Sequence, residues 1–190
     1  EATHVGIGAS MQPEDVFAPS YREYGAQFER GVKPRDVLMY WGGDERGNDF
    51  EIPRNDYPWC VPISTQCLMA SGAALAFKLR GENRVAVATC GDGGSSKTDF
   101  YAAINSAGAF SLPLVLCVIN NGWAISVPRK AQTGAQTLAQ KGLAGGLHCL
   151  QVDGNDLVAV LEAMRRAHER ARTGEGGSVI EFMTYRLHDH

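Results

Sequence analysis

Residues 85–94 read Val-Ala-Val-Ala-Thr-Cys-Gly-Asp-Gly-Gly, an apolar run that ends in a glycine-rich turn around one aspartate. A short apolar run bounded by turn residues is typical of a buried strand in a parallel sheet. The pattern returns at residues 112–123, where Leu-Pro-Leu-Val-Leu-Cys-Val-Ile precedes Asn-Asn-Gly-Trp. Between the two runs, residues 99–108 carry apolar side chains at helical spacing. This order of strand, helix and strand predicts a right-handed βαβ unit.

The rest of the chain continues the alternation. We expect helices at 66–80, at 132–141 and at 156–172, with Ser64 or Thr65 capping the first and Asn155 capping the last. Further strands are expected at 148–152 and 178–185. The prediction is an α/β fold, a parallel sheet with helices on both faces, in one domain covering residues 1–190. The chain opens on Glu1 and stops after a strand-like segment, which we interpret as a piece of a longer polypeptide.

Composition excludes several classes of function. A net charge of −3 provides neither the basic stripe expected of a nucleic-acid binder nor a polybasic face for a membrane surface. The longest apolar run, residues 112–119, is far too short to cross a bilayer. The five cysteines form no Cys-x-x-Cys pair, so we expect reduced, buried thiols and a cytoplasmic setting.

The carboxyl ends of the strands are where ligands of such sheets bind. Asp92 follows the first strand and supplies a hard anionic oxygen, while Asn121 follows the second and supplies an amide oxygen. A turn through Gly122 could direct the Trp123 carbonyl to the same point. Mg²⁺ commonly completes such a partial oxygen shell with phosphate oxygens and water. Each motif alone is better explained as a simple turn, but their pairing at neighbouring strand ends favours a magnesium-diphosphate site.

The paired motifs resemble the signature of thiamine diphosphate (ThDP) enzymes. Further runs narrow the resemblance to the alpha subunit of the decarboxylating component of bacterial pyruvate or branched-chain 2-oxoacid dehydrogenase complexes. The match covers nearly the whole chain in the same order. The runs that carry it are residues 21–25 (Tyr-Arg-Glu-Tyr-Gly), 41–47, 61–66, 124–129, 152–156 and 184–190.

The resemblance implies a role for each matching residue. Asp92, Asn121 and the carbonyl of Trp123 would be Mg²⁺ ligands, and the backbone of Gly93 and Gly94 would contact the diphosphate. The remaining cofactor-binding residues implied are Tyr21, Arg22, Ile63 and His190.

His190 matches the last histidine of the family's Tyr-Arg-x-x-x-His run, and the resemblance makes it the catalytic residue, which orients the 2-oxoacid carboxylate and manages protons. Thr65 and Gln66 fall where branched-chain members hold potassium, although Cys60 and Val61 replace the serines of those members. A helix cap explains Thr65 equally well.

Two further departures matter. Ile119 stands where branched-chain members have an arginine near the diphosphate, so that charge must come from elsewhere, and Thr98 replaces a usual glycine.

The function implied is oxidative decarboxylation of a 2-oxoacid, pyruvate favoured, with ThDP and Mg²⁺. The acyl group would pass to a lipoyl-bearing acyltransferase. The activating glutamate of this family lies on a beta subunit, so we expect an α₂β₂ enzyme and an isolated chain without activity. The alternatives are an acetoin or branched-chain 2-oxoacid dehydrogenase alpha subunit and, from another class, a non-catalytic phosphate- or nucleotide-binding module.

Overall fold

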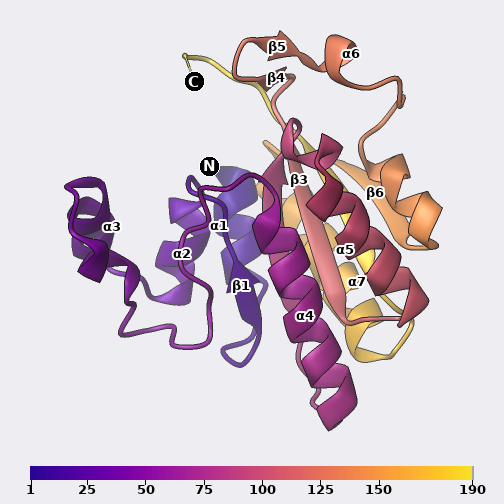
Figure 1. Cartoon of the computed structure of the whole chain (residues 1–190), viewed down its shortest axis with the longest axis horizontal. Helices are drawn as coiled ribbons and strands as arrows, with labels where there is room; N and C mark the ends of the chain where they lie inside the picture. Colours follow the sequence, from indigo (N-terminus) through magenta and orange to yellow (C-terminus); the bar gives the residue numbers. More distant parts are fainter. Residues whose placement is uncertain (190) are drawn as a thin grey trace.

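The chain forms a five-stranded, wholly parallel sheet in a computed structural model that describes residues 1–189 (Figure 1). The register pairs Gly91 with Ile119, so the two strands that precede the predicted metal-binding turns end side by side. The predicted fold class is confirmed. The strand order is β1 (Val16–Ala18), β2 (Ala86–Gly91), β3 (Leu114–Asn120), β7 (Ser178–Met183), β6 (His148–Asp153).

Helices cover both faces of the sheet. On one face, α4 (Thr65–Arg80) and α5 (Thr98–Ala109) contribute alanines and phenylalanines to a core shared with β2 and β3. On the other, α1 (Ala2–Ala9) and α7 (Leu157–Arg172) pack against the same strands through Ile7, Val160 and Met164. Strands buried on both sides explain why their sequences are continuously apolar rather than alternating.

The remaining elements lie at the borders of this sandwich. Figure 1 shows α3 (Pro34–Trp41) projecting at one side, joined to the body through α2 (Tyr24–Arg30). The 3₁₀ turn η1 (Glu45–Asn48) packs on α3. Above the sheet in the same view stand the short pair β4 (Trp123–Ala124) and β5 (Val127–Pro128), followed by α6 (Arg129–Gln132). Two more 3₁₀ turns, η2 (Gly94–Ser96) and η3 (Ala139–Gly145), complete the fold.

Several local predictions were wrong. Residues 132–141 do not form one helix, because side chains from elsewhere take the backbone groups that a helix would pair. Arg129 donates to the carbonyls of Ala135 and Gln136, and the Glu181 carboxylate accepts from the N–H groups that open η3. The cap of α7 is Asp156, which accepts from two backbone N–H groups, and not Asn155.

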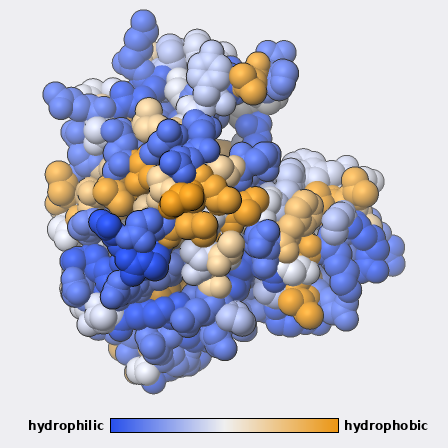
Figure 2. Space-filling model, turned by 180° about the vertical axis from the view of Figure 1, so that it is seen from behind, coloured by the Kyte–Doolittle hydropathy of each residue, from blue (hydrophilic) through white to orange (hydrophobic). Residues whose placement is uncertain are grey.

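The start of the chain also held elements that we did not predict. The strand β1 has only three residues, all buried, and it pairs with β2 at the edge of the sheet. Three residues give no periodicity to detect, and α2 is hardly longer. Within residues 1–189, no helix has the length and apolarity that a bilayer crossing requires. The face opposite to that of Figure 1 carries a band of apolar side chains between polar regions (Figure 2).

Candidate functional site

A cavity of about 820 Å³ opens at the carboxyl ends of the strands, where the fold class places ligands. Its walls come from the segments that follow all five strands, together with the start of α1 and the residues leading into α4. Eight of the nine predicted site residues line this one cavity, and the ninth, His190, lies outside the described residues. The eight are Tyr21, Arg22, Ile63, Asp92, Gly93, Gly94, Asn121 and Trp123.

Asp92 is the chemically most unusual group in this cavity. The residue is only 2 % exposed, and its Oδ2 has no hydrogen-bond partner among residues 1–189. Burial raises the pKa of this carboxyl, while a bond from the Gly93 backbone and the charges of Arg186 and Arg129 act in the opposite direction. An unpaired buried carboxylate oxygen is costly unless a cation or donor meets it. The donor chemistry therefore fits a bound metal ion.

The adjacent residues Asn120 and Asn121 have different roles. Asn121 lines the cavity, and its Oδ1 accepts the backbone N–H of Trp123 at 3.0 Å. Asn120 points away from the cavity lining into the protein, where its side-chain amide donates to Glu181 at 2.7 Å. The chain then turns through Gly122, whose φ of +85° favours glycine. Only the second asparagine can offer a ligand to the cavity, and the first holds the turn in place.

A metal at this point would have one carboxylate and neutral oxygens for ligands. Across residues 1–189, no three His, Cys, Asp or Glu side chains gather as a metal-binding group. That finding excludes a dense, self-sufficient cation cage. A partial oxygen set of this kind suits Mg²⁺ bound together with a phosphate-bearing molecule.

Two glycines of this turn are required because neighbouring atoms leave no room for a Cβ, and not because the backbone must stay open to a ligand. A Cβ on Gly93 would lie 2.7 Å from the Cβ of Ala124, and one on Gly94 would lie 2.7 Å from the Ser64 hydroxyl. A Cβ on Gly91 would meet nothing within 4 Å. Gly93 and Gly94 thus let two neighbouring loops close onto the Asp92 turn.

A buried glutamate shapes the turn that carries Tyr21 and Arg22. Glu23 accepts from the backbone N–H of Ser20 at 3.0 Å, from the Ser20 hydroxyl at 2.9 Å, and from the N–H of Arg22 at 3.3 Å. The Arg22 guanidinium lies 5.4 Å from the centre of the Tyr21 ring. Both side chains thereby stay on the cavity wall, with Arg22 exposed enough to meet an anion.

The segment before α4 contains a strained residue. Ser64 has a φ of +67°, and its hydroxyl donates to the Gly94 carbonyl at 2.6 Å instead of capping the helix. The predicted capping by Ser64 is therefore wrong, although Ser64 occupies the cap position. Positive φ in a non-glycine residue persists only where surrounding contacts enforce it, and such residues cluster at functional sites.

The next two residues bear on the predicted potassium site. The Thr65 hydroxyl donates to Asp99 at 2.9 Å. Gln66 donates through its Nε2 to the Thr89 carbonyl at 2.6 Å, which leaves its buried Oε1 without a partner among the described residues. An unpaired amide oxygen has the right chemistry for K⁺, so the residues fit that ion.

Two arginines near Asp92 were not singled out from the sequence. Arg186 lines the cavity, donates to the Ile125 carbonyl at 2.6 Å and lies 5.4 Å from the Trp123 ring centre. Arg129 and Arg186 are the two cations that oppose the rise in the Asp92 pKa. The sequence held a signal for Arg186: Ile119 leaves a phosphate-binding charge to be supplied, and Arg186 directly follows the strand predicted at 178–185.

The fold belongs with those of thiamin diphosphate-dependent enzymes. A structure named as that of a thiamin diphosphate-dependent enzyme from Mycobacterium smegmatis superposes with a TM-score of 0.61 at 19 % identity, over 97 % of this chain and 31 % of the other. Benzoylformate decarboxylase from Polynucleobacter necessarius superposes with a TM-score of 0.64 at 17 % identity, over 99 % of this chain and 33 % of the other. At these identities the likeness is one of fold.

The sequence comparisons define the family. All of residues 1–190 match the model of the dehydrogenase E1 component. The chain is 42 % identical over its full length to the pyruvate dehydrogenase E1 component subunit alpha of Acholeplasma laidlawii, and 40 % identical to that of Staphylococcus aureus strain Mu50. It covers 55 % and 51 % of those two proteins, so it spans about half of their length. The chain belongs to the dehydrogenase E1 component family, as its sequence motifs predicted.

Proposed function

We propose that this chain is the diphosphate-binding part of a 2-oxoacid dehydrogenase alpha subunit that uses ThDP and Mg²⁺, with pyruvate as the favoured substrate. The observation that carries the proposal is the unpaired, buried oxygen of Asp92, a residue on the wall of a cavity that seven other residues of the predicted site also line. The names of the two relatives, both pyruvate dehydrogenase alpha subunits, support the same activity. Residues 1–190 would act as one ThDP-binding domain.

In this proposal each residue of the cavity has a separate task. Asp92, the Asn121 amide oxygen and the Trp123 carbonyl would hold Mg²⁺, and the backbone of Gly93 and Gly94 would contact the diphosphate. Arg22 is suited to pair with phosphate oxygens through its planar fork. Tyr21 lies beside it on the same wall.

Arg186 is our proposal for the cation that replaces the arginine missing at position 119. It lies on the cavity wall, and its charge already opposes the pKa rise of Asp92. Its bond to the Ile125 carbonyl and its stacking near Trp123 hold it at the edge of the metal-binding turn. K⁺ near Gln66 is a further, separate proposal.

The bound cofactor would supply the electron sink for decarboxylation. This chain would supply the apolar contact of Ile63 and the hydrogen-bonding groups that fix the diphosphate, and His190 would orient the substrate carboxylate and move protons. We assign the beta subunit and the lipoyl-bearing acyltransferase as partners. Exposed apolar side chains such as Leu157 and Val158 fit a surface that a partner covers. We propose a cytoplasmic location.

The test uses the full-length chain co-expressed with its partner subunit. Calorimetry with Mg²⁺ and ThDP should show binding, and the same titration with ATP should not. The assembled enzyme should release CO₂ from pyruvate faster than from branched 2-oxoacids, and the alpha chain alone should release none. Binding of ATP in preference to ThDP would instead support a non-catalytic nucleotide-binding module, and faster turnover of branched acids or acetoin would change the substrate.

A further inference from the structure

Glu181 is a completely buried carboxylate at the centre of β7, next to the metal-binding turn. Its Oε1 accepts from the Asn120 side-chain amide at 2.7 Å. Asn120 in turn uses its own Oδ1 to accept the backbone N–H of Gly122 at 3.0 Å. Glu181 therefore fixes the orientation of the residue that begins the Asn121 turn.

The other oxygen of the same carboxylate holds a different element. Oε2 of Glu181 accepts from the backbone N–H groups of Leu138 and Ala139, at 2.7 and 3.1 Å, and from the Gln151 side chain at 3.2 Å. Leu138 and Ala139 open the 3₁₀ turn η3. No Lys, Arg or His of the described residues pairs with Glu181 within 4 Å, so neutral donors alone satisfy this buried charge.

The turn η3 carries Lys141 back to the phosphate side of the site. Lys141 is 6 % exposed, and its ammonium donates to the Ser95 carbonyl and the Ser95 hydroxyl, both at 2.9 Å, and to the Ser96 hydroxyl at 3.2 Å. These acceptors lie in η2, the turn that follows Asp92. Among residues 1–189 no carboxylate lies within 4 Å of this ammonium, and its hydrogen bonds go to the oxygens of Ser95 and Ser96.

A continuous chain of hydrogen bonds thus runs from one half of the cofactor site to the other. It begins at Asn120, passes through Glu181 to the start of η3, and returns through Lys141 to Ser95 and Ser96. We propose that Glu181 and Lys141 are positioning residues that hold the Asn121 metal-binding turn and the Asp92–Ser96 phosphate-binding turn at a fixed separation. This inference rests on the proposed function and adds to it a specific means of preorganisation.

The physical reason for such a link is the nature of the metal site. Its proposed ligands come from two turns that follow different strands, and Mg²⁺ tolerates little departure from octahedral geometry. Residues behind metal ligands typically change affinity by about 10- to 100-fold when they are removed. Because Glu181 and Lys141 do not line the cavity, their effect should fall on cofactor affinity and not on turnover at saturation.

The experiment compares Glu181→Gln and Lys141→Met in the assembled, full-length enzyme. Lys78→Met is the control, because the Lys78 ammonium also bonds two backbone carbonyls, those of Phe110 and Ser111, but lies far from the cavity. Each site variant is expected to raise the ThDP concentration for half-saturation at fixed Mg²⁺ by at least about tenfold, with turnover at saturation near that of the wild type. The double variant should lose less than the product of the two single losses, because both residues belong to one link.

Hydrogen exchange in the cofactor-free enzyme tests the link independently of binding. The side-chain hydrogen bonds that Lys141→Met removes reach only residues 95 and 96, and the ammonium also lies 5.7 Å from the centre of the Tyr101 ring. The variant is nevertheless expected to speed exchange at 120–124 as well as at 93–97, whereas Lys78→Met should change neither. If Lys141→Met affects 93–97 alone, or if both site variants bind ThDP like the wild type, the inference is wrong while the proposed function stands. If the wild type itself binds no ThDP, the proposed function fails, and the exchange pattern still decides whether the two turns are linked. Should Glu181→Gln not fold, Lys141→Met carries the test.

Discussion

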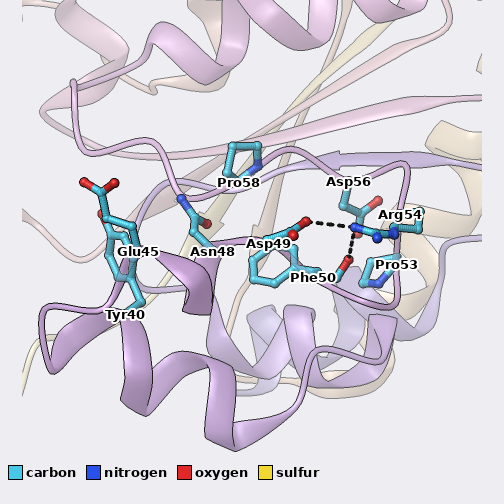
Figure 3. Close-up of a pocket in the computed structure, with 9 residues that line it drawn as sticks. All are labelled: Tyr40, Glu45, Asn48, Asp49, Phe50, Pro53, Arg54, Asp56 and Pro58. Atoms are coloured by element: carbon cyan, nitrogen blue, oxygen red, sulfur yellow. Dashed lines mark hydrogen bonds and ion pairs between the residues drawn. The ribbon is translucent and has the colours of Figure 1, made fainter.

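Two hollows in this molecule differ in how their charges are paired. The cofactor cavity at the end of the sheet has about 820 Å³, and a second hollow of about 590 Å³ lies between α3, η1 and the loop at 49–58 (Figure 3). In the second hollow the Arg54 guanidinium donates to Asp49 at 2.8 Å and to the Phe50 carbonyl at 3.1 Å. The charges of Arg54 and Asp49 are therefore already paired within the chain.

The same contrast holds for the buried carboxylates of the two regions. Asp56, on the wall of the second hollow, accepts two bonds from Arg30 and one from the backbone of Phe17. Burial still raises the pKa of Asp56, while the hydrogen bond and the charge of Arg30 act to lower it. Asp92 has no such partner for its Oδ2. A hollow surrounded by paired charges stabilises the fold, whereas one that keeps an unpaired buried oxygen is prepared for a ligand.

The largest expected effect comes from removing the unpaired charge. Asp92→Asn keeps the shape of the side chain but removes the anionic ligand, so Mg²⁺-dependent ThDP binding should weaken by at least about 1,000-fold, or about 4 kcal/mol. Burial disfavours the charged form of Asp92, so the cofactor-free variant should unfold at the same or a higher temperature than the wild type. Calorimetry and thermal unfolding measure the two effects. Asp49→Asn, in the second hollow, is the control and should leave ThDP affinity unchanged.

The second prediction concerns the buried ion pair between Arg30 and Asp56 beside the second hollow. Arg30→Met leaves the Asp56 carboxylate buried without its cation, since both side chains of this pair are 4 % exposed. Removing one member of a buried pair costs about 3–5 kcal/mol. Urea unfolding should therefore show a large loss of stability, which the double variant Arg30→Met with Asp56→Asn should partly restore. If Arg30→Met leaves the unfolding midpoint unchanged, the paired charges do not hold this region together.

A third prediction concerns an unpaired buried group that needs no ligand. Neither nitrogen of His168 has a well-formed hydrogen bond among the described residues. Burial lowers the pKa of His168 to about 4; the charge of Asp15 and a weak contact with the Met164 backbone oppose this shift, while Arg172 and Arg30 add to it. A buried imidazole that stays uncharged avoids the cost of burying a charge without a partner. A carboxylate stays uncharged less readily at neutral pH. The folded state therefore resists protonation between about pH 6.5 and pH 4, where the unfolded chain accepts a proton.

The sign of the pH effect follows from that difference. The contribution of His168 to stability is fully present above its unfolded pKa of 6.5 and is lost as pH falls toward its folded value of about 4. The loss amounts to about 3 kcal/mol across this window. His168→Phe should remove it, so the difference in unfolding free energy between variant and wild type should change with pH in this range. A difference that stays constant from pH 7 to pH 4 would show that His168 titrates normally.

The sequence predicted the sheet and most of the candidate residues that line the cavity at its carboxyl edge, for an identifiable reason. Buried parallel strands are continuously apolar, as 85–90 and 112–119 are, and each ends in a turn whose residues carry the chemistry. The strand ends then bring Asp92 and Asn121 to one edge without any further information. The family resemblance added Tyr21, Arg22 and Ile63, whose cavity positions no local pattern could supply.

What the sequence did not predict depends on contacts between distant residues. Residues 132–141 have a composition that favours a helix, but Arg129 and Glu181 take their backbone groups. The sequence predicted that Ser64 or Thr65 caps α4, but the Ser64 hydroxyl donates to the Gly94 carbonyl instead. Lys141 lay within the wrongly predicted helix, so its approach to Ser95 could not be seen.

The smallest expected effect separates two glycines of one turn. Gly93→Ala places a Cβ 2.7 Å from the Cβ of Ala124, so the β4 segment must shift, at about 1–2 kcal/mol of stability and with weaker ThDP binding, because Trp123 moves with it. Gly91→Ala meets no atom within 4 Å and has no positive φ, so it should be neutral or slightly stabilising, by up to about 1 kcal/mol. Chemical unfolding and ThDP titration of this pair measure both effects. Equal losses at the two positions would mean that the turn needs glycine for backbone freedom. A loss at Gly93 alone would mean that it needs glycine so that the segment carrying Trp123 and Ala124 can pack against the Asp92 turn.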